Sequence, residues 1–145
     1  MRSLIVLLSL VLVTGCATRG ASSIKNLSIS IQELQRVATD ALPLGKRGQS
    51  QNERELTSEY FIEKDGEYES ARGSKIRKYA QILILGDRRP YTIEVTVAVE
   101  ARDAGGEYSL VKYDQGVARV ITRRIQNALH KRREDRNIID DFRVF

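Results

Sequence analysis

The stretch 76-IRKYAQILILGDRRPYTIEVTVAVE-100 decides how this chain folds. Over residues 91–100, apolar side chains alternate with polar or small ones, which is typical of a strand with one buried and one solvent-facing side. Residues 80–85 are apolar on both faces apart from Gln81, so we expect a strand inside a sheet that is covered at least in part on both sides. The link between them, GDRRP, contains glycine and has hairpin length. The stretch therefore predicts an antiparallel hairpin at the centre of a sheet.

Two further strand-like runs flank this hairpin. In residues 56–63, Leu56, Tyr60 and Ile62 share one face. Residues 108–111 follow the link DAGG, which again has hairpin length. Together the runs predict four antiparallel strands, at 56–63, 76–85, 91–100 and 108–111, connected as a meander.

An amphipathic helix is expected before the strands, at residues 23–42. Apolar side chains from Ile24 to Ala41 recur at alternating spacings of three and four, and Pro43 follows as a stop signal. Leu27 and Ile29 would also fit the alternation of a strand, so the first two turns have a second interpretation.

A second helix is expected to close the domain, capped by Asp114 and ending at about residue 133. Val117, Ile121 and Ile125 fall in one sector of this helix, and basic side chains lie opposite. The predicted fold class is therefore α+β with two layers: an N-terminal helix, a four-stranded antiparallel meander sheet and a C-terminal helix.

The single cysteine, Cys16, stands where a strongly apolar run ends. A short basic start precedes residues 4–13, which are apolar except for Ser9, and the small residues Thr14 and Gly15 follow. A run of about 10 apolar residues fits the central region of a cleaved secretory signal, whereas a bilayer span takes roughly 20. We therefore expect residues 1–15 to be a signal peptide.

Residues 13–16, VTGC, resemble the lipobox of bacterial lipoproteins, in which an aliphatic residue and two small ones precede an invariant cysteine. The resemblance implies that the thiol of Cys16 carries diacylglycerol, that the leader is cleaved before it, and that the new amino terminus is usually acylated too. An ordinary signal peptide with a free thiol is the alternative, but an A-x-A-like cleavage site is missing. A lone cysteine also forms no internal disulfide.

The resemblance further implies attachment to the bacterial cell envelope. In enteric bacteria an aspartate after the cysteine holds lipoproteins in the inner membrane, so Ala17 favours the outer membrane, facing the periplasm. Residues 16–22 then form a lipidated tether. The six residues 17–22, at roughly 3.5 Å each, reach about 20 Å, which keeps the domain at 23–145 close to the headgroups.

Composition limits the partners of such a protein. The 145 residues carry 24 basic and 19 acidic side chains, a formal net charge of +5. A chain of this size buries enough surface to fold as one domain without disulfides or a metal. A mild positive charge on an exported, tethered protein suits an anionic lipid surface or an acidic partner, and we expect no nucleic acid partner.

Enzymatic chemistry finds little support in the sequence. The single histidine, His130, falls on the outward face of the second helix, which argues against a catalytic base, and no Cys/His zinc set exists. Residues 22–25, SSIK, match the S-x-x-K spacing of penicillin-binding enzymes without their other motifs. Glu59, Glu94 and Glu100 are not marked as a catalytic pair. We therefore expect no enzyme, no catalytic residue, no metal site and no cofactor.

Three features are candidates for binding. Two are basic, the second helix and the tip of the central hairpin, and each can also be an ordinary solvated surface. The third is the segment 137–145, whose apolar side chains dock either on the domain itself or on another protein. The candidate residues are Arg88, Arg89, Arg119, Arg123, Arg132 and Arg133 for a partner or anion, and Ile138, Ile139, Phe142 and Phe145 for tail docking.

Two functions follow from these features. The first is a non-enzymatic accessory or assembly subunit of the envelope that binds a protein partner, by analogy with the small lipoproteins that support outer-membrane machines. The alternative is a binding module for an anionic envelope ligand, namely phospholipid, lipopolysaccharide or peptidoglycan, held by the basic helix. Binding by arginines weakens steeply with salt, whereas an apolar protein interface does not.

Overall fold

The computed structural model describes residues 20–141, and its side chains over residues 20–132. Several expected features lie outside this range, and their predictions are unchanged by it. They are the signal peptide at 1–15, Cys16 with its lipobox, Phe142 and Phe145, and the side chains of Arg133, Ile138 and Ile139.

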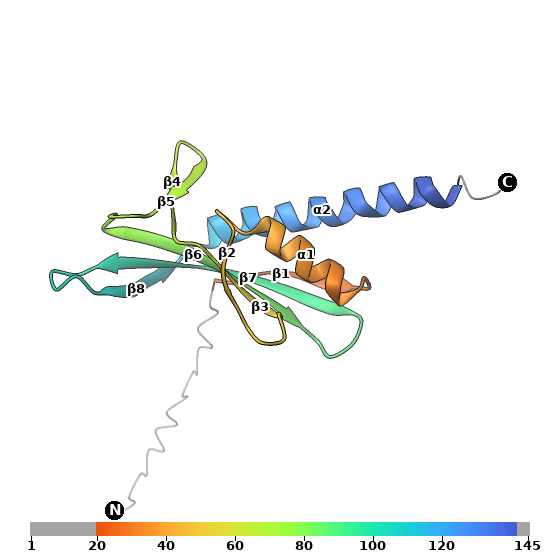
Figure 1. Cartoon of the computed structure of the whole chain (residues 1–145), viewed down its shortest axis with the longest axis horizontal. Coiled ribbons are helices and arrows are strands. Elements are labelled where there is room, and N and C mark those ends of the chain that lie inside the picture. Colours follow the sequence, from red (N-terminus) through yellow and green to blue (C-terminus); the bar gives the residue numbers. More distant parts are fainter. Residues whose placement is uncertain (1–19, 142–145) are drawn as a thin grey trace, which may run out of the picture.

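The described residues form an α+β domain in which two helices pack on one side of an antiparallel sheet (Figure 1). The strands are β1 Ser22–Leu27, β2 Lys46–Gln49, β3 Glu55–Ser58, β4 Phe61–Lys64, β5 Glu67–Ser70, β6 Ile76–Leu85, β7 Tyr91–Arg102 and β8 Tyr108–Tyr113. The helices are α1 Ile31–Ala41 and α2 Gln115–Asp141. The α+β class and the antiparallel sheet are confirmed, but the expected number of four strands is wrong, since the described chain forms eight.

The β6–β7 hairpin is the centre of the sheet, as predicted. Its register runs without interruption from the pair of Ile76 with Ala101 to the pair of Leu85 with Thr92. Alternate side chains, including Ile82, Ile93 and Val95, are fully buried on the side that the helices cover. One-sided burial of two long strands thus explains the period-two pattern of the sequence.

Each outer edge of this hairpin is shared by two short strands. β7 pairs with β1 over its first half and with β8 over its second half, and β6 pairs with β3 and then with β4. Where β3 gives way to β4, the buried hydroxyl of Ser58 takes the place of a backbone partner. It accepts a hydrogen bond from the Ala80 N–H at 2.8 Å and donates one to the Glu59 carbonyl oxygen at 2.8 Å.

The prediction of a helix over residues 23–42 is wrong for its first part, which is strand β1. Ile24 and Leu27 are both buried, at a spacing of three that is typical of a helix. A register shift lies between them, and Asn26 adopts a positive φ of 60°. The irregularity brings Leu27 back to the covered side after three residues instead of two, so a strand imitates the helical period.

Helix α1 itself begins only at Ile31. The Ser30 hydroxyl accepts a hydrogen bond from the Glu33 N–H at 3.2 Å and caps it. Its buried side chains are Leu34, Val37, Ala38 and Ala41.

The predicted strand at 56–63 is also wrong in extent, because it divides into β3 and β4. Two more strands, β2 and β5, were not predicted, and their side chains are mostly exposed. Backbone pairing to β3 and β4 holds them, so no apolar pattern marks them. The turn between β4 and β5 is Asp65-Gly66, both with positive φ, which is a standard hairpin signal.

Helix α2 starts where predicted and ends later than predicted. The Val117 N–H donates to Asp114 Oδ1 at 3.1 Å, which confirms the cap. The helix continues to Asp141, so the expected end at about residue 133 is wrong and Ile138 and Ile139 are helical positions. Ile121 and Ile125 of α2 are fully buried in the core that the sheet and α1 share.

Candidate functional site

The sheet face opposite the helices is left uncovered by the described chain; we call it the open face. Alternation in β6 and β7 places Arg77, Tyr79 and Glu100 on it, because their neighbours Ala80 and Val99 are buried on the covered side. The hairpin register then sets Arg77 directly opposite Glu100. This face therefore carries aromatic and charged side chains in the middle of the sheet.

Arg77 is the centre of this arrangement. Its guanidinium carbon lies 3.6 Å from the ring centroid of Tyr60 and 3.7 Å from that of Tyr108, so two aromatic rings hold it. Its Nε donates a hydrogen bond to Glu100 Oε2 at 2.7 Å. The Tyr108 hydroxyl donates to the Ser74 carbonyl oxygen at 2.6 Å, which fixes one of the two rings.

Further arginines and a tyrosine extend this arrangement along the face. Arg47 stacks 4.1 Å from the Tyr60 centroid, and Tyr79 meets Tyr60 edge to face with centroids 5.9 Å apart. Arg102 lies 5.9 Å from the Tyr108 centroid. We call this set the Tyr–Arg cluster; it consists of Arg47, Tyr60, Arg77, Tyr79, Arg102 and Tyr108.

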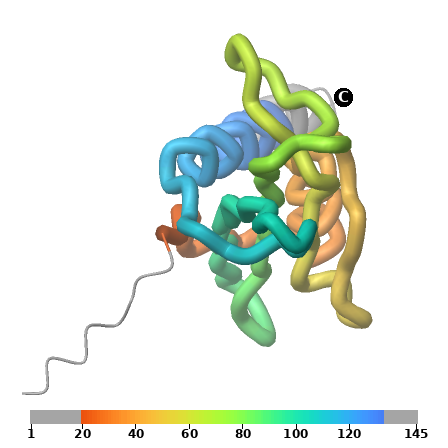
Figure 2. The backbone as a smooth tube through the Cα atoms, turned by 90° about the vertical axis from the view of Figure 1, so that its left-hand side faces the viewer, coloured from red at the N-terminus to blue at the C-terminus, as the bar shows by residue number. Residues whose placement is uncertain are grey.

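A hollow of about 730 Å³ opens beside the cluster. Tyr60, Arg77 and Tyr108 line one part of it, and Tyr68 and the segment 69–73 line another. Tyr68 comes from the β4–β5 hairpin, which stands beside α2 in Figure 2. A shallow site with aromatic walls and a fixed guanidinium is the result.

Burial and neighbouring charges shift the pKa values of two tyrosines in this region. Burial raises the pKa of Tyr79, and the nearby carboxylate of Glu100 raises it further. Burial likewise raises the pKa of Tyr68, although the Arg124 guanidinium, 5.0 Å from its ring, acts in the opposite direction. Both rings therefore keep neutral hydroxyls at physiological pH.

A neighbouring ion-pair network is structural. Lys78 Nζ lies 2.8 Å from Asp114 Oδ2 and 3.3 Å from Glu63 Oε2, which joins β6 to the start of α2 and to β4. Burial alone would lower the pKa of Lys78, but its bonds to Asp114 and Glu63 outweigh that effect and raise it. Burial alone would raise the pKa of Asp114, but the hydrogen bonds from Lys78 and from the Val117 N–H leave it lowered.

The structure does not gather the basic residues that the sequence singled out. Arg119 and Arg123 are exposed on α2, whereas Arg132 is half-buried with its Nη2 3.8 Å from Asp40 Oδ2. Arg88 and Arg89 are exposed in the β6–β7 turn, which Figure 1 shows at one end of the sheet, away from α2. The two basic candidates are thus separate surfaces.

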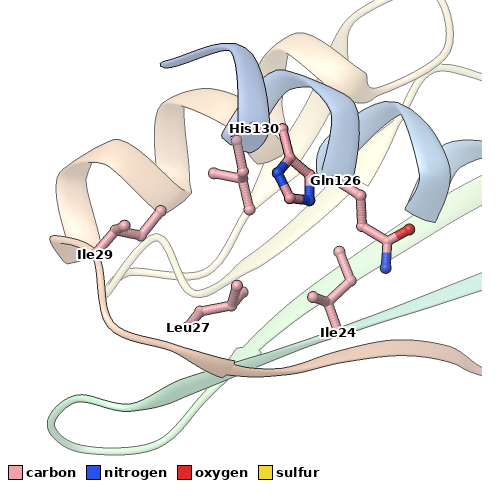
Figure 3. Close-up of a pocket in the computed structure, with 6 residues that line it drawn as sticks. Ile24, Leu27, Ile29, Gln126 and His130 are labelled. Atoms are coloured by element: carbon pink, nitrogen blue, oxygen red, sulfur yellow. The ribbon is translucent and has the colours of Figure 1, made fainter. Parts of the chain in front are cut away.

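His130 is exposed on α2, as predicted, at the rim of a small apolar hollow of about 120 Å³ between β1 and α2. Figure 3 shows Ile24, Leu27 and Ile29 on one side of this hollow, with Gln126 and His130 on the other. No Asp, Glu, Cys or Ser is among the residues that line it. Its described lining is therefore mainly apolar, with Gln126 and His130 as the polar side chains.

Within residues 20–132, no group of His, Cys, Asp and Glu is placed to hold a metal ion. The helices of the described chain are all too short or too polar to span a bilayer. No family model, no curated protein and no solved structure matches this chain.

The Tyr–Arg cluster escaped the sequence interpretation because its members come from five strands and loops. One signal was available. If Leu85 is placed opposite Thr92, one residue beyond the turn at 86–90, Arg77 falls opposite Glu100, a charged residue on the adjacent central strand, and Tyr79 lies on the same face. The positions of Tyr60 and Tyr108 could not be inferred in this way, because they depend on how β4, β8 and the loops beside them pair with the central strands.

Proposed function

We propose that this protein is a lipid-anchored envelope lipoprotein that acts as a non-enzymatic accessory or assembly subunit and binds a protein partner through the open face. The Tyr–Arg cluster carries the proposal. Tyrosine and arginine are the residue types most enriched where protein interfaces concentrate their binding energy. Here they are pre-positioned on a sheet face that the described chain does not cover.

Crosslinking in the native envelope tests the partner. Leu110, 51% exposed and paired with Glu100 on the open face, and Val120, 47% exposed on α2, are matched positions for a photoreactive amino acid. We expect Leu110 to crosslink to one protein, identified by mass spectrometry, and Val120 not to crosslink to it. Crosslinks from Val120 alone would move the interface to α2 and contradict the proposal.

Anchoring is proposed to occur through Cys16. We expect wild-type protein to incorporate labelled fatty acid and to fractionate with the outer membrane, and Cys16→Ser to do neither. A Cys16→Ser protein that still pellets with membranes, together with an unlabelled wild type, would contradict the lipoprotein assignment.

The second candidate function is capture of an anionic envelope ligand by α2. It is favoured by Arg119 and Arg123, which extend from the helix into solvent. In this case Arg119→Ala with Arg123→Ala should abolish binding to lipopolysaccharide or peptidoglycan, and wild-type binding should fall steeply between 50 and 500 mM salt.

A further inference from the structure

We propose that Arg77 is the anchor of a carboxylate-binding site, and that its occupant is a peptide segment of the protein partner carrying an acidic side chain or a free C-terminus. This inference rests on the proposed function, since it specifies the chemistry of the partner that the open face binds.

The first step is the state of the guanidinium. Tyr60 and Tyr108 cover its two planar faces, and Glu100 engages Nε. Among the described side chains, neither Nη of Arg77 has a hydrogen-bond partner, and Arg77 lines the hollow. The rings and Glu100 thus restrict the guanidinium, and its Nη donors are left for a ligand in the hollow that Arg77 lines.

The second step concerns the ligand that the two Nη groups of this guanidinium, which form a fork of donors, would bind. Two parallel N–H donors held in one plane match the two oxygens of a carboxylate. Because the stacked rings and Glu100 already restrict the side chain, a ligand orders it at little further entropic cost. Aromatic walls beside the fork would bury an apolar side chain next to the bound acid.

The third step favours a peptide over a lipid phosphate. Glu59 and Glu69 also line the hollow, so a ligand with several phosphates would meet carboxylates as well as Arg77 and Arg72. A single carboxylate beside uncharged side chains meets Arg77 and leaves these acids in solvent. Half-buried tyrosine beside arginine is typical of a protein interface.

The test uses the full-length lipidated protein in phosphatidylcholine nanodiscs. A display library of random 12-residue peptides is selected against wild type, and the strongest peptide is remade with its carboxylate replaced by an amide. Affinities of both peptides are measured for wild type, for Arg77→Lys and for the control Arg36→Lys. Arg36 is an exposed arginine of α1, on the side of the sheet that the helices cover, and it belongs neither to the cluster nor to the lining of the hollow.

We expect selected peptides to carry Asp, Glu or a free C-terminus beside an aromatic or aliphatic residue. Arg77→Lys and the amide replacement should each weaken binding at least tenfold, and both together no more than either alone, because they remove one interaction. Arg36→Lys should change affinity less than threefold. A Tyr108→Leu variant removes one aromatic wall and should also weaken binding. It provides a second test of the site if circular dichroism shows that Arg77→Lys is misfolded.

Three results would overturn the inference: selected peptides without acids, additive effects of Arg77→Lys and amide replacement, or no selected peptide at all. Arg77-dependent binding of dihexanoylphosphatidylglycerol without peptide binding would assign the fork to a lipid phosphate instead. If Leu110 crosslinks a partner but Arg77→Lys and the amide replacement act independently on peptide affinity, this inference alone fails. If Leu110 crosslinks nothing, the proposed function fails.

Discussion

The two faces of the sheet are built from alternate residues of the same strands, yet their side chains have different roles. On the covered face, Ile82, Ile93 and Val95 are fully buried beneath α1 and α2. On the open face, Arg77 and Glu100 stand among tyrosine rings in contact with solvent. The covered face contributes apolar burial, and the open face presents charged and aromatic side chains.

The contrast teaches that stability and recognition are separable in this protein. A side chain on the covered face is held by close packing, so its truncation costs transfer energy and leaves a cavity. A side chain on the open face has solvent beside it and loses less. The loss of stability on substitution should therefore be larger on the covered face than on the open face, and the following predictions test that ranking.

The largest effect is expected for Ile93→Ala. Ile93 of β7 is 0% exposed in the core, between β1 and β6, and such truncations cost about 2–5 kcal/mol. Thermal unfolding followed by circular dichroism should show a fall in Tm of at least about 6 °C. The adjacent open-face change Thr92→Ala is the control and should cost less than about 1 kcal/mol. Equal losses at the two positions would contradict the contrast between faces.

A smaller loss is expected for Ser58→Ala, which removes a buried polar group from the covered side. The Ala80 N–H and the Glu59 carbonyl would lose their partner, and an unsatisfied buried group costs about 1–3 kcal/mol. Urea unfolding measures the change, with Ser70→Ala on exposed strand β5 as the matched control. Similar midpoints for the two variants would show that water replaces the hydroxyl.

Asp114→Asn should have a pH-dependent effect. Asparagine still caps α2, so the substitution isolates the charge interaction with Lys78, which is worth about 0.5–1 kcal/mol. The folded pKa of Asp114 lies below its ordinary value of 3.8. The stability difference from wild type should therefore be complete above that value and vanish as pH falls through the folded pKa. A difference that did not decrease as the pH was lowered would contradict this explanation.

The smallest effect is expected for Arg119→Ala combined with Arg123→Ala. Both side chains are exposed on α2, away from the core, and such changes usually stay within about 0.5 kcal/mol. Calorimetry should give a Tm close to that of wild type. A clear loss of stability would show that these arginines support the fold, and would remove them from the list of free binding residues.

The same contrast explains how far the sequence could be interpreted. The hairpin β6–β7 was predictable because burial on one side imposes a period of two over long strands. β1 was not, because its irregularity at Asn26 reproduces a helical spacing. β2 and β5 were missed because backbone pairing at the periphery needs no apolar side chains.

The candidate site was harder to predict than the fold. Arg119 and Arg123 attract notice because they are close together in one helix. Tyr60, Arg77 and Tyr108 are distant in sequence and become neighbours only through strand pairing. Their individual residue types look like ordinary solvent-facing positions, so only a correct register would have revealed the cluster.

The entry of the chain into the sheet has a mechanical consequence. Gly20 is buried with a φ of +21°, and a Cβ there would lie 2.9 Å from Cγ of Gln115 at the start of α2. Directly after it, Ser22, Ser23 and Ile24 are paired with β7. If Cys16 is anchored in a membrane as proposed, a pull along β1 would load these strand pairs in shear, together instead of one after another. Tension would then reach the central hairpin directly, and the proposed partner on the open face would be held against a moving membrane without unravelling the domain.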